Sequence, residues 1–133
     1  MMRRRVPKRD AMQLPTEAEL EILNILWALG PSTVRDVHTA SEKETGYTTV
    51  LKQMQVMAEK GLLTRSERYR SHVYAARIAK EQTQRQLARN LVRRAFDGSA
   101  KNLVLGALSS QKVTAEDLAE IRRMLDEYER GSR

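Results

Sequence analysis

The chain has 133 residues, 41% of them hydrophobic but only 5% aromatic, which suits one domain or a small domain with an appendage. Its net charge of +7 and pI of about 10.0 favour a polyanionic partner, unless the charge serves only solubility. The sequence contains no cysteine, which excludes disulfides, thiolate metal sites and cysteine nucleophiles.

The first segment, residues 1–13, is basic and has no hydrophobic period, so we expect a disordered arm. No apolar signal segment follows it, and no apolar run approaches the roughly 20 residues that span a bilayer. We therefore expect a cytoplasmic protein that makes no contact with membranes.

Three helical segments come next. The first, TEAELEILNILWALG, begins with the capping-box spacing of Thr16 and Glu19, and its apolar residues recur at helical intervals. The second is the short segment STVRDVHTA, which Ser32 or Thr33 caps. The third covers residues 47–60 and stops at a glycine.

Alternating residues in LLTRSERYRSHVYAA then predict two short strands around an Arg-Tyr-Arg tip. The tip lacks the Asn-Gly pair that marks a tight two-residue turn. Three helices followed by a hairpin is the order of a winged helix-turn-helix domain, which we assign to residues 14–78. Residues 79–133 again have helical patterns, so the predicted fold class is mainly α.

The third helix has two different faces on a helical wheel. Val50, Met54 and Met57 share an apolar face that we expect to be buried. The opposite face carries mostly hydroxyls and amides, which suit base edges in a DNA major groove better than the Glu and Lys of a typical solvated face. The positions that we assign to DNA binding on this helix are Thr48, Thr49, Lys52, Gln53 and Gln55.

Basic residues in the hairpin support the same interpretation. Residues 47–77 carry six Lys or Arg against two Glu, which is +4 of the total +7. For the polar helix face alone, plain solvation is the simpler explanation, and the basic hairpin shifts the balance. A basic tip beside the helix would contact the DNA backbone or enter a minor groove. The hairpin residues that we assign to DNA binding are Arg65, Arg68, Tyr69 and Arg70.

The helices of residues 79–133 predict a surface for self-association. Residues 14–78 can close a core of their own, whereas the later helices have broad apolar faces and no comparable partner within the chain. Pairing with a second copy of the chain would cover these apolar faces in both copies with one self-complementary surface. The residues that we expect in this interface are Leu103, Leu108, Leu118, Ile121, Leu125 and Tyr128.

The sequence offers little support for catalysis or for a cofactor or metal site. It has no Gly-rich phosphate loop, no nucleophile motif and no isolated carboxylate pair. The two histidines, His38 and His72, have no acidic pair nearby in the sequence. We therefore do not expect an enzyme.

The same residues resemble the BlaI/MecI/CopY family of bacterial repressors, the penicillinase-repressor type. The resemblance covers about residues 14–128 and rests on LPTEAELEILNILWALGPSTVRDVH, YTTVLKQMQVMAEKGLLTR and LVRRAFDGSAKNLVLGAL. It implies a homodimer on a palindromic operator in double-stranded DNA. The implied arrangement has helix 47–60 in the major groove, wing 65–72 on the backbone or minor groove, and the C-terminal helices between the subunits.

Three departures from the family pattern limit what the resemblance implies. In the antibiotic-resistance members a membrane sensor protease triggers cleavage of the repressor at an Asn-Phe bond, where this chain has Gly106 and Ala107. The cysteine-rich metal motif of the copper-responsive members is absent, and Leu51 stands where a basic residue is common. The resemblance therefore leaves open the operator sequence and the inducer, whether a sensor protease or another signal.

Two other functions stay open at this point. The winged helix could serve as a protein-interaction module, with its polar face against another protein. Alternatively, charge alone could drive nonspecific binding to nucleic acid. A salt titration with specific and random duplexes separates these functions, because only sequence reading gives a large affinity ratio between duplexes.

Overall fold

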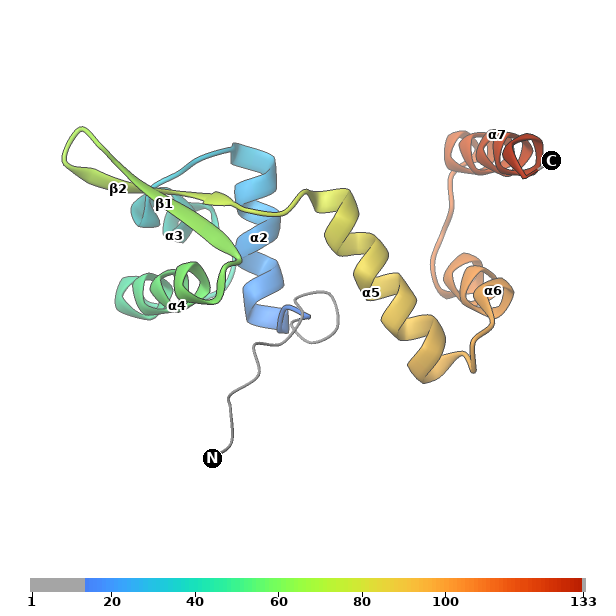
Figure 1. The fold of residues 1–133 in the computed structure, drawn as a ribbon, viewed down its shortest axis with the longest axis horizontal. Coiled ribbons are helices and arrows are strands. Elements are labelled where there is room, and N and C mark those ends of the chain that lie inside the picture. Colours follow the sequence, from blue (N-terminus) through green and yellow to red (C-terminus); the bar gives the residue numbers. More distant parts are fainter. Residues whose placement is uncertain (1–13, 133) are drawn as a thin grey trace, which may run out of the picture. The chain divides into compact units, whose positions relative to one another are not determined.

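The computed structural model describes residues 14–132, so the basic arm expected at residues 1–13 lies outside the described part of the chain. Within the described residues, helices and one two-stranded antiparallel hairpin form two compact units, which divide between Ala88 and Arg89 (Figure 1). The predicted fold class, mainly α with a winged helix, is confirmed. No helix in this range is long and apolar enough to cross a membrane.

The first unit contains three helices, the hairpin and the first half of a fourth helix. Its elements are α2 (Glu17–Leu29), α3 (Val34–Ala40), α4 (Tyr47–Lys60), β1 (Leu63–Arg68), β2 (Ser71–Ala76) and the start of α5 (Lys80–Ala95). The second unit contains the rest of α5, α6 (Ala100–Ser110) and α7 (Ala115–Gly131). The units therefore divide inside α5, whereas the sequence-based boundary precedes that helix.

Local sequence signals explain where the helices begin and end. The Thr16 hydroxyl accepts a hydrogen bond from the Glu19 amide at 3.1 Å, and the Thr16 amide donates to the Glu19 carboxylate at 3.0 Å, which confirms the capping box of α2. Thr33, rather than Ser32, caps α3. Helix α4 ends at Gly61, whose φ of 87° lies in the left-handed region that favours glycine.

The core of the first unit lies between α2, α3, α4 and the hairpin. Met54 and Met57 are fully buried and Val50 is nearly so, which confirms the predicted inner face of α4. The buried apolar residues are Ile22, Leu23, Leu26, Val34, Val37, Val50, Met54, Met57, Leu62, Leu63 and Tyr74. The inner face of α4 is thus fully used in packing, and its other face is left for solvent or a partner.

The hairpin has a tighter tip than its sequence suggests. Arg68 pairs with Ser71, so the loop consists of Tyr69 and Arg70 alone. Both residues have positive φ, 54° and 66°. This is the pattern of a two-residue type I′ turn, which normally uses Asn-Gly because left-handed backbone is unfavourable for other side chains.

Two contacts fasten the hairpin to the helices. Ser32 pairs with Tyr74 as in a short third strand, with backbone N···O distances of 2.9 and 2.8 Å. Farther along, the indole N–H of Trp27 donates to the carbonyl of Ile78 at 3.0 Å. The path of the chain from the wing into α5 is therefore fixed on α2.

The second unit has caps but little burial. Asp97 and Gly98 turn the chain with φ of 50° and 82°, and Ser99 then caps α6. Thr114 caps α7. No residue of α6 or α7 is buried within the described range. Helix α6, with 11 residues, depends on contacts beyond its own turns, because isolated helices of this length are marginal in water.

Candidate nucleic-acid interface

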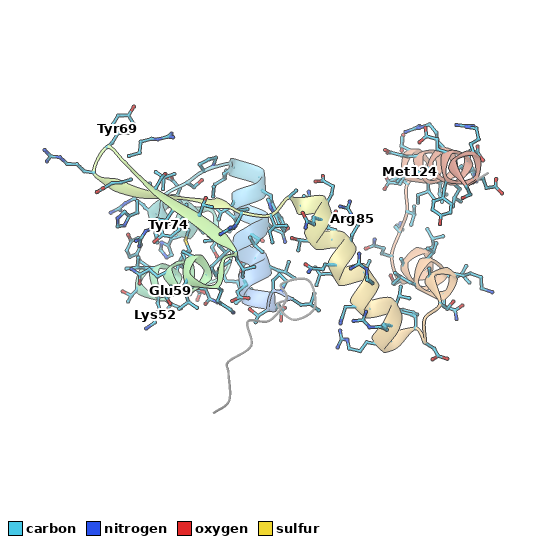
Figure 2. All side chains as sticks on the ribbon, in the orientation of Figure 1. Lys52, Glu59, Tyr69, Tyr74, Arg85 and Met124 are labelled. Atoms are coloured by element: carbon cyan, nitrogen blue, oxygen red, sulfur yellow. The ribbon has the colours of Figure 1, made fainter. Side chains whose placement is uncertain are left out.

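The outer face of α4 carries most of the polar side chains that the sequence assigns to DNA binding. Thr48, Thr49, Lys52 and Gln55 are exposed. Figure 2 labels Lys52 and Glu59 on this helix. Apart from Lys52, Glu59 and Lys60, the exposed groups of α4 are uncharged hydrogen-bonding side chains and Val56, which is 36% exposed.

The two glutamines in the middle of α4 lie in different surroundings. Gln53 is half-buried and lines a cavity of about 50 Å³ on the side of α2 and α3. Gln55 is exposed and lines a surface groove together with Glu59 and Arg65 of the wing. Gln55 is therefore better placed than Gln53 to meet a partner that covers both helix and hairpin.

The four assigned wing residues are all exposed but do not form one cluster. Tyr69 is 93% exposed and stands at the tip of the hairpin (Figure 2). The register places Arg65 opposite the buried Tyr74 and Arg68 opposite Ser71. Because alternate strand residues face opposite sides, Arg65 shares the side of the ribbon that turns toward the helices, and Arg68 faces the other side.

The positive charge of this region is largely unpaired. Lys60 forms an ion pair with Glu19 of α2 at 2.6 Å, which leaves five cations against two acids in residues 47–77, a net +3. Among residues 14–132, no ion pair involves the other cations of α4 and the hairpin, Lys52, Arg65, Arg68 and Arg70. These side chains are available to a polyanion.

The ion pair of Lys60 also sets the protonation of Glu19, which is only 3% exposed. Burial disfavours the charged carboxylate, but the Lys60 ammonium and the two hydrogen bonds with Thr16 outweigh it, and the pKa of Glu19 lies below its ordinary value. Lys60 and Glu19 therefore stabilise the packing of α4 on α2. The +4 expected from the sequence includes Lys60, because a pairing across 41 residues leaves no local signal.

The comparisons with known proteins agree on one family. The family model described as penicillinase repressor matches residues 15–127. A transcriptional regulator BlaI of Mycobacterium tuberculosis is 29% identical over 118 residues, which cover 86% of this chain and 85% of that protein. A penicillinase repressor of Bacillus licheniformis is 21% identical over 115 residues, covering 85% and 90%.

The chain belongs to the penicillinase repressor family. This is a family of transcriptional repressors and not of enzymes, as the sequence predicted. Among residues 14–132 of this family member, no three His, Asp or Glu side chains gather as a metal site requires.

The second unit of this penicillinase-repressor family member exposes a large part of its apolar surface. Among the residues assigned to a dimer interface, Leu125 is 60% and Tyr128 77% exposed. The other four, Leu103, Leu108, Leu118 and Ile121, are half-buried. Leu108, Ile121 and Met124 line one shallow groove between α6 and α7.

Three apolar side chains of the second unit that are at least half exposed are missing from the assigned set. They are Val104, Leu105 and Met124, each at least half exposed. Val104 and Leu105 belong to the continuous run LVLGAL, which has no helical period and so does not indicate which residues face outward. Met124 lies on the regular apolar stripe of α7, so periodicity alone was sufficient to include it.

Proposed function

We propose that this protein is a transcriptional repressor that binds a palindromic operator as a homodimer. The names of its relatives support repression. The observation that supports sequence reading is the outer face of α4, where uncharged hydrogen-bonding side chains lie beside the unpaired cations of the wing. In this proposal α4 enters the major groove, and the hairpin lies on the backbone or in the minor groove.

In this proposal α4 contacts the bases and the hairpin contacts the phosphates. Lys52 and Gln55 read base edges, since glutamine pairs bidentately with adenine and lysine reaches guanine acceptors. Arg68 and Arg70, one on the outer side of the ribbon and one at its tip, bind phosphates. Phosphate contacts position the domain on any sequence, whereas base contacts choose the site.

Dimerisation is proposed because the second unit leaves several large apolar side chains exposed. Leu125 and Tyr128 are mostly exposed, and burial of each such side chain is worth about 1.5–3 kcal/mol. A two-fold pairing of α6 and α7 would remove this exposure with one surface. It would also join two winged-helix domains, each with its own half-site. The two modest half-site affinities would then combine through effective concentration.

Release from the operator is proposed to follow a route other than cleavage of an Asn-Phe bond. By the resemblance to the family, Gly106 and Ala107 stand at that position, and both lie within α6. Gly106 faces the ring of Phe96, where an added methyl group would lie 3.5 Å from the ring. This distance is an ordinary van der Waals contact, so the packing of Phe96 on α6 does not itself require glycine at this position.

The test is a selection of bound duplexes from a randomised pool, followed by titration of the selected and a scrambled duplex at several salt concentrations. Sequence-specific repression predicts a palindromic consensus and an affinity ratio of at least about 10³. A steep salt slope without that ratio would indicate charge-driven binding. Absence of duplex binding would instead favour a protein-interaction module.

A further inference from the structure

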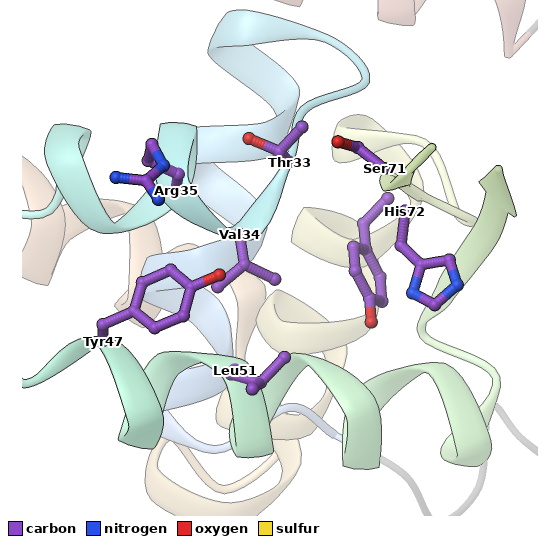
Figure 3. A pocket seen from close by; sticks show the side chains of 8 residues that line it. Thr33, Val34, Arg35, Tyr47, Leu51, Ser71 and His72 are labelled. Atoms are coloured by element: carbon purple, nitrogen blue, oxygen red, sulfur yellow. The ribbon is translucent and has the colours of Figure 1, made fainter. Parts of the chain in front are cut away.

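A groove of about 290 Å³ lies where α3, α4 and the wing meet. Figure 3 shows Arg35 and Tyr47 on one side of its opening and Ser71 with His72 on the other. The remaining lining residues are Thr33, Val34, Leu51 and Tyr74. The volume is close to the lower end of the range for small-molecule sites.

The groove gathers hydrogen-bonding groups that the fold does not use. Within residues 14–132, the side chains of Arg35, Tyr47, Ser71, His72 and Tyr74 make no hydrogen bond or ion pair. Every other buried side-chain nitrogen or oxygen in this range has a partner, and only the Tyr74 hydroxyl has none. Tyr74 is 1% exposed, and a buried hydroxyl without a partner is costly.

Apolar and aromatic surface accompanies these polar groups. Val34 and Leu51 line the groove together with the Tyr47 ring. The Arg35 guanidinium carbon lies 6.0 Å from the centre of that ring, and His38 meets the ring edge-on at 5.9 Å between centroids. Tyr47, which is 42% exposed, thus forms an aromatic side of the groove, and Arg35 places a positive charge over its ring.

We propose that this groove binds a small molecule that combines a planar apolar body with an oxyanion. The body packs on Tyr47, Val34 and Leu51, and the oxyanion accepts hydrogen bonds from Arg35 and the neighbouring donors. A backbone phosphate of DNA shares the oxyanion chemistry but has no planar apolar group for these residues.

A ligand in this groove would act on DNA binding. The walls of the groove are the start of α3, the first turns of α4 and strand β2. Helix α4 and the hairpin are the elements that we propose to contact DNA. An occupied groove adds negative charge beside α4 and the wing, so it repels the DNA backbone. This consequence depends on the proposed function, whereas the binding of the ligand itself does not.

The test of binding uses the full-length protein without DNA and 1-naphthyl phosphate as probe, observed by ³¹P NMR and by calorimetry. We expect saturable binding with a dissociation constant below about 1 mM, as ligand efficiency allows for a probe of this size. Inorganic phosphate and 1-naphthol should each bind at least about tenfold more weakly, because each offers only half of the expected contacts. Equal binding of either control compound would overturn the proposal.

Two substitutions locate the probe. Arg35→Gln should weaken binding about tenfold or more, and Tyr74→Phe about threefold to tenfold, the loss expected for one hydrogen bond. Tyr74→Phe removes only a hydroxyl without a partner in the described residues, so its melting temperature should stay equal or rise. Arg85→Gln, on the exposed surface of α5, is the matched control and should bind as wild type does.

Two results would contradict the proposal. One is the absence of saturable binding up to about 10 mM probe, well above the range that ligand efficiency allows. The other is unchanged binding in Arg35→Gln and Tyr74→Phe, which would place the probe elsewhere.

A second experiment tests the effect of the ligand on DNA binding. With the selected operator present, the probe should lower the operator affinity of wild type and have a weaker effect on Tyr74→Phe. If the probe binds but does not change operator affinity, the result counts against the proposed DNA-binding surface and not against the ligand site.

Discussion

The Lys60 ammonium lies 2.6 Å from the Glu19 carboxylate and joins the last turn of α4 to the first turn of α2. The same carboxylate completes the capping box of α2 through the Thr16 amide. The buried Glu19 side chain therefore fixes both the start of α2 and the end of α4, the helix that we propose to enter the major groove. The orientation of α4 on the domain depends on this contact as well as on its apolar face.

Replacement Glu19→Gln should lower the free energy of unfolding by about 1–2 kcal/mol at neutral pH, since it removes the charge from a partly buried hydrogen-bonded pair. Chemical denaturation monitored by Trp27 fluorescence measures the change. Glu17→Gln is the matched control, because Glu17 lies in the same helical turn but is exposed. Equal small losses in both variants would contradict the role given to Glu19.

The pH dependence of this difference follows from the lowered pKa of Glu19. A carboxylate with a depressed folded pKa contributes its stability above its ordinary value of 4.5 and loses it as the pH falls through the folded pKa. The gap between wild type and Glu19→Gln should thus be constant near neutrality and shrink progressively below pH 4.5. A gap that widens on acidification would contradict this assignment.

The tip of the wing should become more stable when its sequence is matched to its backbone. Tyr69 and Arg70 both have positive φ, so the pair Tyr69→Asn and Arg70→Gly should raise the free energy of unfolding by about 1–2 kcal/mol. Thermal unfolding of the double variant measures the effect. DNA affinity should fall in the same variant, because two side chains assigned to DNA are lost.

Arg68→Gly controls for the loss of an arginine in this experiment. Arg68 lies in β1 and has no positive φ, so glycine there should cost about 0.5–1 kcal/mol. If Arg68→Gly stabilised the protein as much as the tip variant, removal of charge and not turn geometry would be the cause.

Much of the fold follows from signals that are local in the sequence. The capping box of Thr16 and Glu19 and the apolar stripe of Val50, Met54 and Met57 each involve residues within two helical turns. Their energetics are set largely by neighbours along the helix, so a pattern of side chains is sufficient to predict them. The two faces of α4 were predictable for this reason.

Other features of the fold could not be predicted from local sequence patterns, because they depend on residues far apart in the chain. The hydrogen bond from Trp27 to Ile78 spans 51 residues, and the Tyr74–Ser32 pairing joins a loop to a strand. The turn at Tyr69 and Arg70 overrides the conformational preference of both residues, because strand pairing on either side fixes the loop length. The groove around Tyr74 could not be foreseen either, since three elements far apart in the chain contribute its walls.

Disruption of the apolar stripe of α7 should separate the subunits. Ile121→Asp with Leu125→Asp places two charges on this stripe, and sedimentation should show a monomer at concentrations where wild type is dimeric. The operator affinity should fall by at least about 10²-fold, since the two half-sites are no longer linked. A double variant that remained dimeric would remove this surface from consideration as the interface.

The control for this experiment is Ala119→Asp with Arg123→Gln. It changes the net charge by the same amount, but both positions lie on the opposite side of α7 on a helical wheel. We expect the control variant to sediment and to bind operator as wild type does. Circular dichroism of both variants verifies that the helices persist.

Loss of a wing cation should weaken DNA binding without changing its selectivity. Arg70→Ala should reduce the affinity for operator and scrambled duplex by similar factors and flatten the salt slope by about one unit. Fluorescence anisotropy at several salt concentrations measures both quantities, with Arg85→Ala as the control cation on α5. A loss confined to the operator would mean that Arg70 reads bases.

The most direct measurement of sequence reading by α4 is the affinity of Gln55→Ala for the selected operator and for the scrambled duplex. Gln55 is exposed on α4 beside the groove that Arg65 also lines, and Gln84→Ala, an exposed glutamine of α5, is the control. We predict a loss of about 1–3 kcal/mol on the operator, little change on the scrambled duplex and no effect of the control. Equal losses on both duplexes would contradict base reading by this helix.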